Sequence, residues 1–123
     1  MLFSAKNGRI GDTDYVRFGS GERVLIMLPG LGDGLQTVKG TALPMALIYR
    51  KLAKDFTIYM FSRKNDLPDG HTTRAMARDL AEAMEALGIR RASLLGVSMG
   101  GMIAQHFAAD YPELVEKLVL VVT

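Results

Sequence analysis

The sequence has no cysteine, and its 123 residues include only two histidines, His71 and His106. Without cysteine the chain can form neither a disulfide framework nor a thiolate metal site. Two isolated histidines make a poor set of metal ligands. We therefore expect a protein that uses no disulfide and binds no metal.

Strong charge and long apolar runs are also missing. The net charge is +2 and the basic residues are scattered, so nucleic acid is not expected as a partner. No apolar run is long enough to span a bilayer, and residues 1–6 lack the apolar centre of a signal peptide. A composition of 49% hydrophobic and 23% charged residues is typical of a globular domain with one core. The expectation is a cytoplasmic protein without a membrane partner.

Six strands are expected from the apolar runs. The first two form a hairpin with a tight turn at Asn7-Gly8, and the later ones are apolar almost throughout, as in strands covered on both faces. The expected strand ranges are 2–6, 14–18, 23–28, 56–61, 92–97 and 114–122.

Helical patterns separate the later strands. A helix over 44–54 is expected to bury Leu47, Ile48 and Leu52. A second helix begins after a cap at Thr72 or Thr73 and ends at Gly88, and a third covers 99–110. Strands that alternate with helices at short intervals predict an α/β fold, a mostly parallel sheet with helices on both faces.

The most informative stretch is Gly96-Val97-Ser98-Met99-Gly100, which lies between the expected strand 92–97 and the helix 99–110. A sharp strand-to-helix turn exposes a serine above the sheet edge, and the glycines on either side remove side chains that would collide there. A serine hydroxyl becomes a nucleophile once it is exposed and placed beside a base. This stretch resembles the nucleophile elbow of the α/β-hydrolase superfamily, which implies that Ser98 is the catalytic nucleophile.

A second loop supports the resemblance. Gly30-Leu31-Gly32 follows the expected strand 23–28, where relatives commonly carry His-Gly-x-Gly, and Pro29 stands in place of that histidine. The resemblance implies that the backbone amides of Leu31 and Met99 form the oxyanion hole.

The same glycines could indicate a dinucleotide-binding loop instead. That fingerprint requires a third glycine where this chain has Leu35, and a nucleotide P-loop requires Gly-Lys-Ser/Thr, which does not occur. No cofactor is therefore expected.

The resemblance covers essentially the whole chain, and it implies that residues 1–123 are the N-terminal half of a single α/β-hydrolase core domain, truncated after its sixth strand. Family members continue with a cap, two further strands, the acidic triad residue and the catalytic histidine. His106 lies about 12 Å along the helix from Ser98, too far to take its proton, and is expected to pair with Asp110. His71 is expected to be a solvated residue beside Thr72. The acid and the histidine are thus expected from a C-terminal part.

The function implied by the resemblance is hydrolysis of a carboxylic ester or a related acyl substrate through an acyl-enzyme on Ser98. C–C bond hydrolysis, lactone hydrolysis, cofactor-free haloperoxidase chemistry and a non-catalytic binding role stay open, because fold does not choose among them. The last strand would present an apolar edge, which favours pairing with the C-terminal half of the hydrolase or with another copy. The fragment alone is expected to be inactive.

Overall fold

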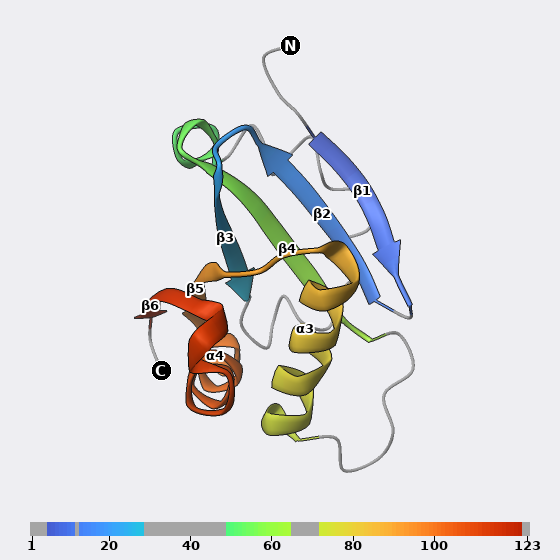
Figure 1. Cartoon of the computed structure of the whole chain (residues 1–123), viewed down its shortest axis with the longest axis vertical. Coiled ribbons are helices and arrows are strands. Elements are labelled where there is room, and N and C mark those ends of the chain that lie inside the picture. The colour runs from blue at the N-terminus through green and yellow to red at the C-terminus, as the bar shows by residue number, and fades with distance from the viewer. Residues whose placement is uncertain (1–4, 12, 29–48, 65–71, 122–123) are drawn as a thin grey trace.

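The computed structural model describes residues 5–11, 13–28, 49–64 and 72–121 (Figure 1). Within these ranges, six strands form one sheet in the order β1-β2-β4-β3-β5-β6. Their bounds are β1 Ala5–Ile10, β2 Thr13–Gly19, β3 Arg23–Leu28, β4 Phe56–Lys64, β5 Ala92–Val97 and β6 Val115–Val121. The predicted ranges of β3 and β5 are confirmed residue for residue, because an apolar strand buried in the middle of a sheet has the clearest sequence signal.

Strands β4, β3, β5 and β6 run parallel, and β1 and β2 add an antiparallel hairpin to the β4 edge. In the β3–β5 pair, Leu28 lies opposite Gly96, so the two strands end at the same edge of the sheet. The prediction of an α/β fold with a mostly parallel sheet is confirmed. In such sheets, sites form at the edge where the parallel strands end.

Helix α3 (Thr73–Leu87) has the two ends that the sequence predicts. At its start, the Thr72 hydroxyl accepts a hydrogen bond of 3.0 Å from the amide of Ala75. At its end, Gly88 adopts a φ of 73°, a left-handed conformation that glycine adopts without strain. Both signals are local, so they could be read without knowledge of the fold.

Helix α4 (Met99–Asp110) and α3 both cover the same face of the sheet, as Figure 1 shows. Their buried residues pack with side chains of the strands into one core cluster that includes Ile26, Met84, Leu94 and Phe107. The opposite face has its own buried cluster around Val16, Phe18, Ile58 and Met60.

The helix expected over 44–54 lies largely outside the described residues. Its described end is the short 3-10 helix η1 (Leu52–Lys54), which packs on the second face through Ala53. The expectation that Leu52 is buried is wrong, because its side chain is 39% exposed whereas that of Ala53 is 8% exposed. The tight 3-10 turn points Ala53 rather than Leu52 at the sheet.

The hairpin turn predicted at Asn7-Gly8 is also wrong. Both residues lie within β1, and the chain turns after Ile10, where Gly11 has a φ of 58°. Gly8 lies opposite Tyr15 in the ladder, and a Cβ on Gly8 would overlap the Tyr15 ring. This glycine therefore makes room for an aromatic side chain of the core, and tertiary packing overrides the local turn signal.

Strand β6 lies at the end of the described sheet, after the short 3-10 helix η2 (Pro112–Leu114). Its last four residues are large, apolar and exposed, with Val119 48% exposed. Because neighbouring residues of a strand point to opposite faces, both faces of this end of β6 are apolar and exposed among the described residues, although α4 contacts part of the strand. No helix in the described part of the chain is long and apolar enough to cross a membrane.

Candidate functional site

Ser98 joins the end of β5 to the start of α4. Its backbone has a φ of 54° and a ψ of −117°, and it is the one non-glycine residue with a positive φ among the described residues. Such a conformation costs on the order of 1–3 kcal/mol and persists only where the surrounding structure holds it. The side chain is exposed. The strained, exposed serine predicted between strand and helix is therefore present in the structure.

The hydroxyl of Ser98 does not cap the helix. A serine at this position usually accepts a hydrogen bond from an amide in the first turn. Ser98 makes no such side-chain bond to α4 in the described structure, and its φ differs from that of an ordinary cap. The oxygen is therefore not occupied by the role that serine most often plays at a helix start.

Gly96 allows β5 and α4 to approach each other closely. A Cβ placed on Gly96 would lie 2.6 Å from the carbonyl oxygen of Gly100 and 2.6 Å from Cα of Gly101, distances that real side chains do not adopt. These neighbours are backbone atoms, which cannot move aside as the end of a flexible side chain can. Glycine at position 96 is thus a steric requirement of the turn.

Backbone hydrogen bonds hold Ser98 on two sides. On the helix side, its carbonyl oxygen accepts from the amides of Gly101 at 2.9 Å and Met102 at 3.3 Å. On the sheet side, its amide donates to the carbonyl oxygen of Val121 in β6 at 2.9 Å. The contribution of Val121 was not predicted from the sequence, because a backbone carbonyl has no residue signature and the pairing depends on the register of β6.

The structure describes one of the two residues expected to form the oxyanion hole. Met99 is the first residue of α4, and its partly buried side chain packs against the core cluster below. Amides in the first turn of a helix lie at the positive end of the helix dipole, where a developing negative charge is stabilised. Leu31 lies outside the described residues.

Of the two histidines, the structure describes His106. His106 lies within α4, eight residues beyond Ser98, and is half-buried. The expected pair of His106 with Asp110 is wrong, because Asp110 accepts from Arg74 at the start of α3 instead, at 3.1 Å. The flexible side chain of Arg74 reaches across between the two helices, which the sequence spacing alone could not reveal. His71 lies outside the described residues.

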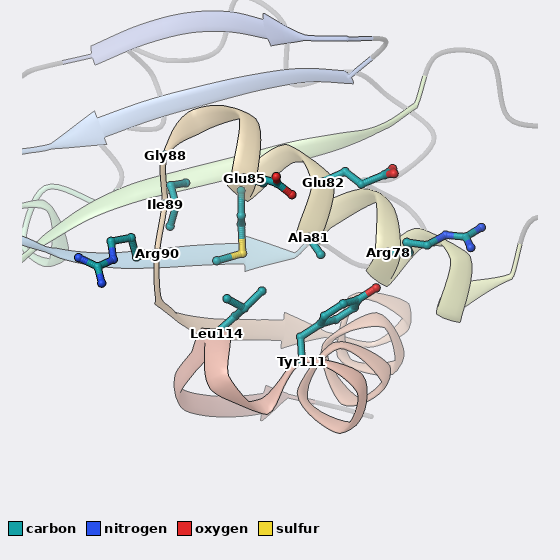
Figure 2. A pocket seen from close by; sticks show the side chains of 10 residues that line it. Arg78, Ala81, Glu82, Glu85, Gly88, Ile89, Arg90, Tyr111 and Leu114 are labelled. Atoms are coloured by element: carbon teal, nitrogen blue, oxygen red, sulfur yellow. The ribbon is translucent and has the colours of Figure 1, made fainter.

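A groove lies along α3, away from Ser98 (Figure 2). It has a volume of about 490 Å³ and is mainly apolar, with charged side chains from α3 beside it. Gly88, Ile89 and Arg90 border it just before β5 begins, whereas Ser98 follows the other end of β5, about 20 Å away for a strand of this length. The groove therefore does not lie beside Ser98. Its lining residues are Arg78, Ala81, Glu82, Met84, Glu85, Gly88, Ile89, Arg90, Tyr111 and Leu114.

No group of three His, Cys, Asp or Glu side chains that could hold a metal ion occurs within the described ranges.

Comparison with known proteins gives relatives along nearly the whole chain. The chain is 36% identical over 116 residues to serine hydrolase BPHL of Mus musculus, covering 86% of this chain and 38% of the relative. It is 34% identical over 111 residues to 2-hydroxy-6-oxo-6-phenylhexa-2,4-dienoate hydrolase of Comamonas testosteroni, again covering 86% and 38%. The chain thus spans well under half the length of the curated relatives it matches.

Solved structures of other proteins have a similar fold. A hydrolase from Pseudomonas aeruginosa has a similar fold with a TM-score of 0.73 and 26% identity, over 94% of this chain and 44% of that one. Cfl2 from Burkholderia cenocepacia shares the fold with a TM-score of 0.72 at 23% identity, over 96% of this chain and 40% of that one.

The family profile described as "alpha/beta hydrolase fold" matches residues 23–123, a range that includes the whole parallel part of the sheet and the turn at Ser98. On these grounds the chain belongs to the α/β-hydrolase family.

Proposed function

We propose that this chain carries the nucleophile of a serine hydrolase that acts on a carboxylic ester or a related acyl substrate. One observation carries the proposal: Ser98 is exposed and held at a φ of 54° where β5 passes into α4. A strained backbone at a functional position persists where the fold over-determines it. The serine hydrolase among the relatives supports acyl transfer as the proposed chemistry.

In the proposed reaction, Ser98 Oγ attacks the acyl carbonyl carbon while its proton passes to a histidine. The carbon–oxygen bond to the alcohol then breaks, and the alcohol leaves with that proton. Water attacks the acyl-enzyme in the same way and releases the acid together with free Ser98. The amides of Leu31 and Met99 are proposed as donors to the oxyanion, each contributing on the order of 3 kcal/mol.

The histidine and the acidic residue are proposed to come from a C-terminal part of the hydrolase. Residues 1–123 would then be the N-terminal half of one core domain, without its cap and last strands. Two observations support this: the chain covers only 38% of relatives such as serine hydrolase BPHL, and β6 is apolar and exposed at the sheet edge. An apolar edge strand is a template for a further strand. Self-association through β6 is the alternative.

A second candidate reaction is hydrolysis of a C–C bond. It is favoured by the relative from Comamonas testosteroni, whose name describes the hydrolysis of a dienoate. Lactonase activity, cofactor-free haloperoxidase activity and a non-catalytic binding role stay predictions, as does the cytoplasmic location.

The test is labelling of the complete hydrolase, including its C-terminal part, with a serine-reactive fluorophosphonate. We expect one adduct on Ser98, lost in Ser98→Ala and kept in Ser20→Ala, because Ser20 is an exposed serine that follows β2. A complete protein without an adduct on Ser98 would contradict the proposal. A panel of short aryl esters, lactones and vinylogous diketones then separates the ester reaction from the C–C reaction.

A further inference from the structure

The conformation of Ser98 needs support from both sides, from helix α4 and from the sheet. A φ of 54° in a non-glycine residue is unfavourable, so an unsupported serine would relax toward negative φ. The helix side supplies two bonds to the Ser98 carbonyl, from Gly101 and Met102. These bonds fix the carbonyl end of the residue and leave the amide end to be fixed by the sheet.

The amide end is fixed by β6. The Ser98 amide donates to the Val121 carbonyl at 2.9 Å, which continues the parallel ladder in which Val97 lies opposite Val121. In a parallel ladder, alternate residues of one strand direct both backbone groups to the same neighbour. The backbone groups of Val119 and Val121 therefore point to β5, and those of Leu118 and Leu120 point to the outer edge of β6.

The element that provides this acceptor is the least protected strand of the described sheet. Its residues from Glu116 to Val121 are all exposed, and β6 pairs with β5 on one side only in the described sheet. Elements with few buried apolar contacts and exposed hydrogen bonds open most readily. The support of Ser98 thus depends on a strand whose own order depends on what pairs with it.

We propose that the backbone carbonyl of Val121 is a positioning group for the nucleophile, and that the order of β6 therefore regulates the reactive conformation of Ser98. An ordered β6 keeps the Ser98 amide bonded and the backbone at positive φ. A frayed β6 releases the amide, and the strained backbone relaxes. The coupling between the order of β6 and the backbone conformation of Ser98 does not depend on the proposed function. Its relevance to catalysis rests on that function.

Two truncations that differ by one residue test the coupling. The chain ending at Val121 keeps the acceptor as a terminal carboxylate, and the chain ending at Leu120 has lost it. We expect amide hydrogen exchange at Ser98 to be about ten-fold faster in the shorter chain, the change expected for one backbone hydrogen bond. The Cα and Cβ chemical shifts of Ser98 should move toward those of negative φ. Exchange at Ile26 and Leu94, which are fully buried, should not change in either chain.

Two variants of the 123-residue chain complete the experiment, the first as a control and the second as a further test of the acceptor. Val121→Ala removes most of the side chain but keeps the carbonyl, so Ser98 exchange should stay within about two-fold of the unmodified chain. If the shortest chain fails to fold, an ester in place of the peptide bond after Val121 weakens the same acceptor without removing a side chain, and should accelerate Ser98 exchange alone. Unchanged Ser98 exchange and shifts on loss or weakening of the acceptor would overturn the proposal, as would an equal effect of Val121→Ala. Fluorophosphonate labelling of the complete hydrolase reports on the proposed function independently of this result.

Discussion

Gly96 lies against Gly101, and a Cβ on Gly96 would be 2.6 Å from Cα of Gly101. The strand that leads to Ser98 and the helix that follows it are therefore in direct backbone contact. Any side chain at position 96 would force the strand and the helix apart. It would thereby disturb the hydrogen bonds made by the amide and by the carbonyl of Ser98.

Replacement of Gly96 by alanine should lower the free energy of unfolding by about 1–3 kcal/mol, the usual range for overpacking. Fluorophosphonate labelling of Ser98 in the complete hydrolase should slow, because the turn is displaced. Urea denaturation and labelling rates measure the two effects. Gly11→Ala is the matched control, since Gly11 has a φ of 58° and no atom within 4 Å of its added Cβ. It should lose about 1–2 kcal/mol through backbone strain and leave labelling unchanged. Labelling of Gly96→Ala at the unmodified rate would contradict the steric argument.

The strain at Ser98 predicts an unusual order of stability for its variants. Ser98→Gly should be more stable than Ser98→Ala by about 1 kcal/mol, because only glycine adopts a positive φ without a steric penalty. At an ordinary strand or helix position alanine would be the more stable of the two. Thermal or urea unfolding of both variants measures the difference, and a more stable Ser98→Ala would show that the backbone is not strained. Both variants should fail to form a fluorophosphonate adduct.

The cap of α3 is testable by itself. Thr72→Ala removes the hydroxyl that accepts from Ala75 at 3.0 Å and should lower the free energy of unfolding by about 1 kcal/mol. Thr72→Ser keeps an acceptor at the same place and should stay near the unmodified value. Equal losses in the two variants would mean that the threonine acts through its methyl group rather than as a cap.

Glu116 links stability to pH. Hydrogen bonds from Arg23, whose Nη2 lies 2.8 Å from Oε1 of Glu116, hold the pKa of this carboxyl below its ordinary value. A carboxyl with a lowered pKa in the folded state stabilises the protein above its unfolded pKa, and this contribution is lost as the pH falls through the folded pKa. Stability should therefore fall at pH values below the ordinary pKa of a glutamate, about 4.3.

The difference in unfolding free energy between the unmodified chain and Glu116→Gln should thus shrink from pH 7 toward pH 3. Urea denaturation across this range measures it. Because the pair is exposed, added salt should reduce the difference at pH 7. A constant difference across the range would show that the carboxylate charge is not involved.

The exposed face of β6 predicts association of the isolated chain. Size-exclusion chromatography of residues 1–123 should show species larger than a monomer, and Val119→Lys should shift them toward the monomer, because a charge on an edge strand opposes pairing. Ala86→Lys, at an exposed position of α3, adds the same charge elsewhere and should not shift the profile. A stable folded monomer of the unmodified chain would contradict this expectation.

Features that depend on residues close together in the chain could be predicted from the sequence. The ranges of β3 and β5, the Thr72 cap and the end of α3 at Gly88 all follow from local chemistry: a continuous apolar run, a hydroxyl that reaches the first turn, and a residue without a Cβ at positive φ. The position of Ser98 between strand and helix could be predicted for the same reason, because Gly96, which the turn requires, lies only two residues before it.

Contacts between residues far apart in the chain could not be predicted, because they depend on how the elements pack. Gly8 makes room for the Tyr15 ring instead of forming a turn, and Asp110 pairs with Arg74 of another helix instead of with His106. The Val121 carbonyl reaches the Ser98 amide only because β6 pairs with β5 in one register. Every residue has a backbone acceptor, so no sequence pattern distinguishes the one that the register of two strands places beside Ser98.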